Sequence, residues 1–583
     1  MPGPGAKIGT ATPTALRLND VAIMAVTGVL AGCGLVYEYL LAHAAGRVLG
    51  AVEAVIFTMI GVMIVSMGIG AFLAKTVREP FAGFAWLEAI LAALGGLSVL
   101  VLGGITALIV LLPRTLADTF GLPPDLVPRG GLVETLERIS SLAPYALGAV
   151  LGILVGMEIP LLARVRQEVH SRHLVHNAGT IYGADYIGAG VGAALWVGFM
   201  LAMEPAYAAV LTAAANLVMG VVFLVLFRRW IRRVWLLLAL HGVVAATLLV
   251  VGAHATDWAR AMEDMLYTDR VVFSTTTEHQ RLTVTERVID PELVPVTSFY
   301  INGRLQFVSN DEHVYHAMLT YPPLAASART ESVLVIGGGD GLAVRDILRW
   351  NPREVMVLDL DSGVVDLFKN PLVRNGIVVN RTLLELNGFA FRDPRVEVRF
   401  GDAFLSVDAL LTQGKRFDTI IVDLPDPSHP DLNRLYTVRF YAKLRQLLSG
   451  DGAMSVQSTS PYHAREAFLS IGKTVAAAGF AAVEQYHQNV PNFGEWGFTI
   501  AVPRGRPATR RIAALKTLPI DDGWTTPEVV RGAFAFAKGQ FDGLEDIEVN
   551  RLGTAALYRY YQRNWEAEQG LFNKTENISN PRP

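Results

Sequence analysis

The chain has 583 residues, of which 52% are hydrophobic, and a mean hydropathy of +0.36. This composition is too apolar for one soluble domain, and the length is too great for a single core. The formal net charge of −3 argues against a protein that binds nucleic acid. The single cysteine, Cys33, excludes a disulfide framework and a cysteine metal cluster.

Residues 1–255 are predicted to form a multi-pass helical membrane domain. Seven apolar stretches are long enough to cross a bilayer, which takes about 20 helical residues. They are Val21–Ala42, Ala54–Ala74, Ala89–Leu112, Ala143–Leu162, Ala178–Ala202, Ala206–Phe227 and Val234–Ala253. Between the third and fourth, the spacing of Leu132, Val133, Leu136 and Ile139 predicts a short amphipathic helix at the membrane interface.

The basic residues alternate between the two sides of this domain. The N-terminus and the second, fourth and sixth loops hold most of them: Lys7, Arg17, Lys75, Arg78, Arg164, Arg166, Arg172, Arg228, Arg229, Arg232 and Arg233. The other loops hold Arg47, Arg114, Arg129 and Arg138. This bias predicts that the N-terminus lies in the cytoplasm.

An odd number of spans then places the chain after Ala253 outside the cell, whereas a domain whose ligand is made in the cytoplasm would have to lie inside. Three explanations stay open: one stretch does not span, the charge rule fails, or the domain is outside. The weakest of the seven spans is Val234–Ala253, which has His241-Gly242 at its middle.

Three acids, Glu38, Glu158 and Asp185, lie within the apolar stretches. A carboxylate in hydrocarbon is costly, so we expect all three to face the interior of the bundle. They either make structural hydrogen bonds, or lie near the interface, or bind a cation such as a polyamine.

The chain becomes polar after the membrane domain, and three further segments are predicted: a linker and small β subdomain (256–325), a catalytic domain (326–504) and a C-terminal helical cap with a polar tail (505–583). In the first, Arg281–Thr285 alternates as a strand does, and Asn302-Gly303 is the turn dipeptide of a hairpin over Ser298–Phe307. A helix over Asp311–Tyr321 is predicted to end at Pro322-Pro323.

Strands and helices alternate in the catalytic segment, which predicts a doubly wound α/β domain, Rossmann-like and of the S-adenosylmethionine-methyltransferase type. The expected strands are Val333–Ile336, Val355–Leu358, Val396–Phe400, Thr419–Val422, Ala453–Gln457 and Phe498–Val502. In the cap, the amphipathic stretch Val549–Trp565 carries Leu552, Leu557, Tyr558 and Tyr561, which pack either on the domain or on the membrane surface.

A glycine turn, Gly337–Gly341, follows the first of these strands, and Asp359 ends the second. Glycine lets the backbone approach a nucleoside, and an acid at the end of the second strand can hold ribose hydroxyls. Asp340, inside the turn, repels phosphate and attracts a cation, which indicates a positively charged nucleoside.

Acids follow four consecutive strands, at Asp340, Asp359, Asp402 and Asp423. One such acid is usually a helix N-cap, but four predict an acidic cleft at the carboxyl edge of the sheet.

The stretch from about Asp257 to Arg504 resembles the spermidine synthase (polyamine aminopropyltransferase) family. The matching motifs are Gln306, Asp311-Glu312, Tyr315-His316, Gly337-Gly338-Gly339-Asp340-Gly341, Asp359-Leu360-Asp361, Gly401-Asp402-Ala403 and Asp423-Leu424-Pro425-Asp426-Pro427. Residues 1–255 are similar to the membrane segment fused to such domains in bacteria, with Tyr37-Glu38 and Asp185 in matching places.

The resemblance implies transfer of an aminopropyl group from decarboxylated S-adenosylmethionine to a diamine such as putrescine, which gives spermidine and methylthioadenosine without a metal or other cofactor. It also implies a homodimer or higher oligomer in the lipid bilayer. Asp340 would bind the donor ammonium, Asp359 the ribose and Asp402 the adenine amino group, while Asp423 would orient and deprotonate the attacking amine. The other implied binding residues are Gln280, Gly337, Gly339 and Ala403 for the nucleoside and Gln306, Tyr315, His316, Asp426 and Trp496 for the amines.

Two departures make the acceptor amine less certain than the reaction: His279 replaces the usual tyrosine, and Pro491–Phe498 matches its family motif only in part. One alternative is a methyltransferase, but ordinary S-adenosylmethionine would bring a carboxylate against Asp340. The other is a polyamine sensor or transporter with a soluble half that does not react, against which the intact Asp340 and Asp423 argue.

Overall fold

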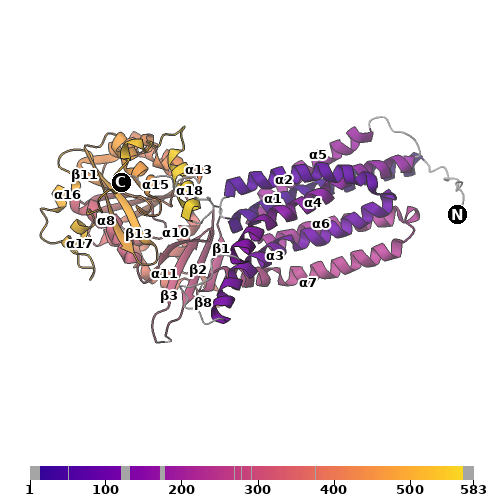
Figure 1. Cartoon of the computed structure of the whole chain (residues 1–583), viewed down its shortest axis with the longest axis horizontal. Helices are drawn as coiled ribbons and strands as arrows, with labels where there is room; N and C mark the ends of the chain where they lie inside the picture. The colour runs from indigo at the N-terminus through magenta and orange to yellow at the C-terminus, as the bar shows by residue number, and fades with distance from the viewer. Residues whose placement is uncertain are drawn as a thin grey trace. The chain divides into compact units, whose positions relative to one another are not determined.

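The computed structural model describes residues 13–568, apart from 50–51, 120–131, 171–176 and the single positions 268, 278, 291 and 375. The chain divides into two units, Met1–Val271 and Val272–Pro583 (Figure 1). This division lies beyond residue 255 because the last helix of the first unit continues to Leu266.

Within its described residues, the first unit has seven long helices. They are α1 (Pro13–Leu49), α2 (Val52–Leu73), α3 (Pro80–Thr119), α4 (Leu132–His170), α5 (Asn177–Gly198), α6 (Pro205–Leu226) and α7 (Val234–Leu266). Six are long and apolar enough to cross a membrane, and α5 is not among them. Since α7 is one of the six, the expectation that Val234–Ala253 is the weakest span is wrong.

Successive helices of this unit alternate in direction. One apolar cluster gathers the N-terminal parts of α1, α3, α5 and α7 and the C-terminal parts of α4 and α6: Ile23, Phe81, Ile181, Leu237, Val165 and Phe223. A Cβ on Gly188 would collide with Gly28, and one on Gly192 with Gly32, so α5 runs parallel to α1 in close backbone contact. The 22 residues of α5 cover about 33 Å at 1.5 Å per residue. The first unit therefore begins and ends at opposite ends of its bundle.

The short interfacial helix predicted around Leu132–Ile139 is wrong, because these residues form the first turns of α4, which continues through Pro144 and Pro160. The local cost of a proline inside a helix is offset by packing, since Gly152 and Gly156 of α4 lie directly against the backbone of α2. Of the three predicted interior acids, Glu158 is buried, while Glu38 and Asp185 are half-buried.

The second unit begins with a four-stranded antiparallel sheet. Its strands, in spatial order, are β1 (Arg270–Thr276), β2 (Arg281–Arg287), β3 (Val296–Ile301) and β4 (Arg304–Val308). Asn302 and Gly303 both have positive φ, at 51° and 77°, which confirms the predicted hairpin turn.

Helix α8 (Glu312–Ala326) follows and contains Pro322 and Pro323, so the expectation that these prolines end the helix is wrong. Both prolines are buried, and the backbone N–H of Ser327 still bonds to the carbonyl of Pro323 at 3.0 Å. Burial in the core therefore compensates for the two amide donors that proline removes.

A seven-stranded sheet forms the centre of the unit. In spatial order its strands are β12 (Ala482–Val490), β13 (Gly494–Val502), β11 (Leu448–Gln457), β10 (Phe417–Asp423), β5 (Ser332–Gly337), β6 (Glu354–Asp359) and β9 (Val396–Phe400). The strands from β11 to β9 pair in parallel, and β13 is antiparallel to both of its neighbours. Edge strand β12 was not predicted, because Glu484, Gln485, His487 and Gln488 interrupt its apolar pattern.

Helices cover both faces of this sheet. Val333 and Val335 of β5 belong to one apolar core, whereas Leu334 and Ile336 belong to the other. This confirms the predicted doubly wound α/β fold. In the cap, Tyr561 of α18 (Ala556–Glu568) joins the second core, so this residue packs on the domain.

The strand order reverses between β5 and β10. The chain leaves β5 toward β6 and β9, then returns to place β10 on the other side of β5. Asp423, the last residue of β10, is paired in register with Gly337, the last residue of β5. Ligands of such sheets bind at this reversal, outside the carboxyl ends of the strands.

Candidate active site

The glycine turn brings the backbone of β5 against two acids. Gly337 has φ 81°, and a Cβ there would lie 2.0 Å from the carbonyl oxygen of Asp423. A Cβ on Gly339 would lie 2.7 Å from Oδ2 of Asp359. Larger residues at these positions would push the turn away from the carboxyl edge, so glycine is required by the close approach.

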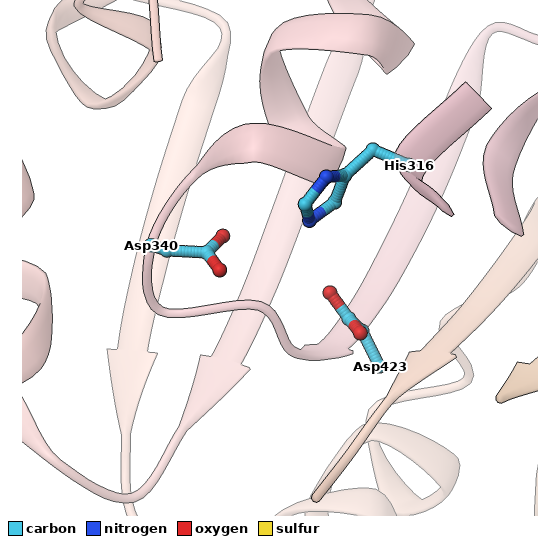
Figure 2. Close-up of side chains that lie close together, drawn as sticks. All are labelled: His316, Asp340 and Asp423. Atoms are coloured by element: carbon cyan, nitrogen blue, oxygen red, sulfur yellow. The ribbon is translucent and has the colours of Figure 1, made fainter. Parts of the chain in front are cut away.

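Three side chains meet at this edge: the buried His316 from α8, and the half-buried Asp340 from the glycine turn and Asp423 from the end of β10. One ligand atom of each residue lies within 4.8 Å of those of the other two. Figure 2 shows the imidazole of His316 pointing between the two carboxylates. The sequence predicted all three as site residues, and the fold brings them together from three separate segments between residues 316 and 423.

The surroundings of His316 favour its charged form. Burial opposes the charged imidazole, but the hydrogen bond and the charge of Glu312 outweigh burial and raise the pKa of His316 to about 9. Its Nδ1 lies 2.8 Å from both the carbonyl oxygen and Oε2 of Glu312. A protonated imidazole has no lone pair for a metal ion. The two carboxylates and one imidazolium therefore leave one net negative charge to attract a cationic ligand.

Glu312 is itself held as an anion. Arg345 donates from Nη1 to Glu312 Oε1 at 2.7 Å. Although burial raises the pKa of Glu312, its contacts with His316 and Arg345 outweigh burial and lower that pKa to about 2. The row of charges from Arg345 through Glu312 to His316 fixes the orientation of the imidazole.

Asp423 lies among groups that shift its pKa in both directions. Burial and the nearby charge of Asp340 raise its pKa to about 6, against the lowering effects of His316 and of the Tyr315 hydrogen bond. The hydroxyl of Tyr315 donates to Oδ1 at 2.8 Å. Trp496 packs edge-on to Tyr315, with ring centroids 6.0 Å apart, and its buried indole N–H has no hydrogen-bond acceptor among the described residues.

Asp426 accepts hydrogen bonds that the sequence did not predict. Gln457 Nε2 donates to Oδ1 at 2.8 Å, and the Tyr561 hydroxyl donates to Oδ2 at 3.0 Å. Burial raises the pKa of Asp426, and these bonds and the charge of Arg304 oppose that shift. A single glutamine at a strand end and a tyrosine on a C-terminal helix form no motif, so neither gave a signal in the sequence.

The acids expected to hold the nucleoside lie at the ends of β6 and β9. Asp359 accepts from the backbone N–H of Asp361 at 2.8 Å, and burial raises its pKa to about 6. Asp402 accepts from the N–H of Phe404 at 2.8 Å and pairs with Arg434 at 2.9 Å. Asp402 is thus also the N-cap of α12 (Ala403–Thr412), whose first residue is the predicted Ala403.

Two predicted site residues, Gln306 and Gln280, make no hydrogen bond to His316, Asp340 or Asp423 in the described part of the chain. The side-chain amide of Gln306 donates to the carbonyl of Arg304 at 3.1 Å, within its own strand. The backbone carbonyl of Gln280 accepts from the Thr277 N–H at 2.8 Å. In the described part of the chain, neither side chain bonds to the three central residues.

Comparison with known proteins identifies the family. Residues 312–511 match the family described as "Spermine/spermidine synthase domain". The polyamine aminopropyltransferase of Shewanella oneidensis is 53% identical over 553 residues, 95% of this chain and 96% of that protein. The polyamine aminopropyltransferase of Oceanobacillus iheyensis is 31% identical over 565 residues, 94% and 99% of the two chains. A crystal structure of spermidine synthase in complex with the transition state analogue AdoDATO is 23% identical, with a TM-score of 0.40, over 47% of this chain and 88% of that one.

The match to the first two relatives extends over nearly the full length of all three chains, including the membrane unit. This confirms the resemblance that the sequence motifs indicated. The chain belongs to the polyamine aminopropyltransferase family.

Proposed function

We propose that the second unit transfers the aminopropyl group of decarboxylated S-adenosylmethionine to a diamine such as putrescine, which yields spermidine and methylthioadenosine. The observation that carries this proposal is that Asp340, Asp423 and His316 meet at the reversal of the sheet, in surroundings that raise the pKa of His316. Membership of the family supports the reaction class.

The chemistry asks the protein to align two reactants and to accept one proton. The amine lone pair forms a bond to the carbon beside S⁺, the C–S bond breaks, and its electron pair stays on sulfur as methylthioadenosine leaves. Asp423, with a pKa of about 6, is ionised at neutral pH and can take the proton that the new ammonium releases. Tyr315 occupies Oδ1, so Oδ2 is the oxygen available to the amine.

Asp340 selects the donor by charge. With His316 charged, the three central residues carry one net negative charge, which the ammonium of the aminopropyl group neutralises. Ordinary S-adenosylmethionine would add a carboxylate at this place, and that repulsion argues against a methyltransferase.

The remaining carboxylates would hold the ends of the two substrates. Asp426, with its three donors Gln457, Tyr561 and Thr459, would bind the distal ammonium of the diamine. Asp359 would accept the ribose hydroxyls beside Gly339, and Asp402 would accept the adenine amino group.

The decisive assay uses the purified full-length protein in detergent, with decarboxylated S-adenosylmethionine and a panel of diamines, and mass spectrometry to detect the products. We expect one diamine to gain an aminopropyl group while methylthioadenosine appears in equal amount. Methyl transfer from ordinary S-adenosylmethionine would instead identify a methyltransferase. Binding of methylthioadenosine without turnover of any amine would identify a sensor or transporter.

For the location, we propose a bacterial inner membrane with the N-terminal end of the bundle in the cytoplasm. Basic residues gather at that end: Arg166 pairs with Asp20 at 2.6 Å, and Arg164 donates to the carbonyl of Val77 at 2.7 Å. Because the first unit begins and ends at opposite ends of its bundle, the second unit then faces outward. A reporter fused after Pro583 is therefore expected to be periplasmic, and a cytoplasmic reporter would show that the basic end of the bundle does not face the cytoplasm.

A further inference from the structure

Five polar side chains meet in the interior of the membrane unit. They are Tyr37 of α1, Glu88 of α3, Glu158 of α4, Asn216 of α6 and His241 of α7, with exposed fractions of 0, 0, 5, 0 and 1%. We call this group the acceptor cluster. The sequence prediction missed Glu88, because it began the third span at Ala89, whereas α3 begins at Pro80.

Direct contacts join three of these residues. Asn216 Nδ2 donates to Glu88 Oε2 at 2.7 Å. A Cβ on Gly220 would meet His241 Nε2 at 2.7 Å and Glu88 Cβ at 3.0 Å, so the ring nitrogen lies beside the stem of Glu88.

Packing brings the other two residues to the same place. Leu91, one turn from Glu88, and Val155, one turn from Glu158, pack in one cluster with Tyr37. Glu158 interacts electrostatically with Glu88, and Tyr37 interacts with both acids. The five side chains therefore surround one region of the bundle.

Each member of the cluster has a buried polar atom without a hydrogen-bond partner in the described part of the chain: Tyr37 Oη, Glu88 Oε1, Glu158 Oε1, Asn216 Oδ1 and His241 Nε2. His241 Nδ1 lies 2.9 Å from the carbonyl of Leu237 and must donate to it, which makes Nε2 an acceptor in the neutral ring. When both acids are ionised, four of the five atoms only accept, and the Tyr37 hydroxyl alone brings a proton.

The acids also have no cation. Among the described residues, no lysine, arginine or histidine forms an ion pair with Glu88 or Glu158. Unpaired carboxylates and unsatisfied acceptors at this depth cost several kcal/mol. A ligand with a positive charge and several N–H donors would remove both costs. An ammonium group has three such donors, and its methylene chain suits the apolar walls formed by Leu91 and Val155.

We propose that the acceptor cluster is an intramembrane binding site for a protonated alkyl amine. This site is separate from the active site in the second unit. The choice of a diamine as its ligand rests on the proposed function, because the same class of molecule would be handled by both units.

The test measures binding of radiolabelled putrescine to the full-length protein in lipid nanodiscs. The starting protein carries Asp340→Asn and Asp423→Asn, which weaken amine binding in the second unit. We expect one saturable site to persist in this protein. Adding Glu88→Gln or Glu158→Gln should weaken it at least about tenfold, since a hydrogen bond to a charged group contributes about 1.5–3 kcal/mol. Adding Glu79→Gln, which changes an exposed carboxylate of the same unit, should leave it unchanged.

Two competitors test the chemistry of the ligand. Excess methylammonium should displace putrescine, whereas butane-1,4-diol, which has the same length but no charge, should not. Displacement by sodium at the same concentration as methylammonium would overturn the proposal in favour of an inorganic cation site. Absence of a saturable site, or equal binding in all variants, would also overturn it.

Folding is checked by methylthioadenosine binding to the second unit and by a monodisperse elution profile. If the glutamine variants fail these checks, putrescine affinity is measured in a Tyr37→Phe variant instead. This substitution removes one hydroxyl and keeps the volume of the ring. A loss of about threefold or more supports the site, and unchanged affinity contradicts it. Since aminopropyl transfer by the unmodified protein is assayed separately, failure of the proposed function and failure of this site give different results.

Discussion

Both units hold carboxylates largely out of contact with water, but they surround them differently. In the second unit, three acids at or beside the site have a donor or a counter-charge: Tyr315 for Asp423, Gln457 and Tyr561 for Asp426, and Arg345 for Glu312. In the first unit, Glu88 has only the amide of Asn216, and one of its oxygens has no partner in the described residues. The acids of the second unit are therefore held in place before any substrate arrives, whereas those of the first unit need a ligand to satisfy them.

The largest expected effect comes from removing the base in the pre-arranged site. Asp423→Asn should lower the rate of aminopropyl transfer by about 10²–10⁴-fold, the range for a positioned base. Methylthioadenosine affinity, measured by calorimetry, should stay close to that of the unmodified protein because the amide keeps the shape of the side chain. Turnover at a near-normal rate would remove Asp423 from the mechanism.

The second largest effect is expected at Asp340, whose charge is proposed to select the donor. Asp340→Asn should weaken binding of decarboxylated S-adenosylmethionine by about 10–100-fold, since it removes a charged hydrogen-bond partner. Methylthioadenosine lacks the ammonium, so its affinity serves as the control and should change much less. Equal losses for both ligands would mean that Asp340 acts only through the turn, where it accepts from the N–H of Leu342.

A third prediction concerns pH. Because Asp423 must be ionised and its pKa is raised to about 6, kcat/KM should fall by an additional factor of about ten per pH unit below that value. Above it, kcat/KM should keep rising up to about pH 10, because the neutral fraction of the free amine keeps increasing. Tyr315→Phe removes a hydrogen bond that lowers the Asp423 pKa, so it should move the lower midpoint upward. A midpoint that stays fixed in this variant would assign the titration to another group, such as Asp359.

The smallest effect should come from the cap. Tyr561→Phe removes one hydrogen bond to Asp426, so KM for the diamine should rise about 3–10-fold, in line with about 0.5–1.5 kcal/mol for one bond. Because Asp426 is proposed to hold the distal ammonium, KM for the nucleoside should not change. Tyr558→Phe, on the same helix, is the matched control, and an equal effect from it would point to general loosening of α18.

Much of the second unit was predictable from the sequence. Four apolar residues before the glycines predicted β5, and acids directly after strand ends predicted that Asp340, Asp359, Asp402 and Asp423 would share one edge, because parallel strands end at the same side of a sheet. The prediction that Pro322 and Pro323 end a helix was wrong, because packing in the core compensates for the hydrogen bonds that these prolines remove inside α8.

The sequence by itself determined the two-part plan, the α/β fold and the acids at the strand ends, because these depend on hydrophobic periodicity and on residues adjacent in the chain. Only the tertiary structure decided that His316 is charged, that Tyr561 reaches Asp426 from the C-terminal helix, and that Glu88 lies inside the bundle beside His241. Each of these depends on contacts between residues far apart in the chain. Burial and the nearest charges set the protonation and the hydrogen bonds of a side chain, and neither can be read from its neighbours in sequence.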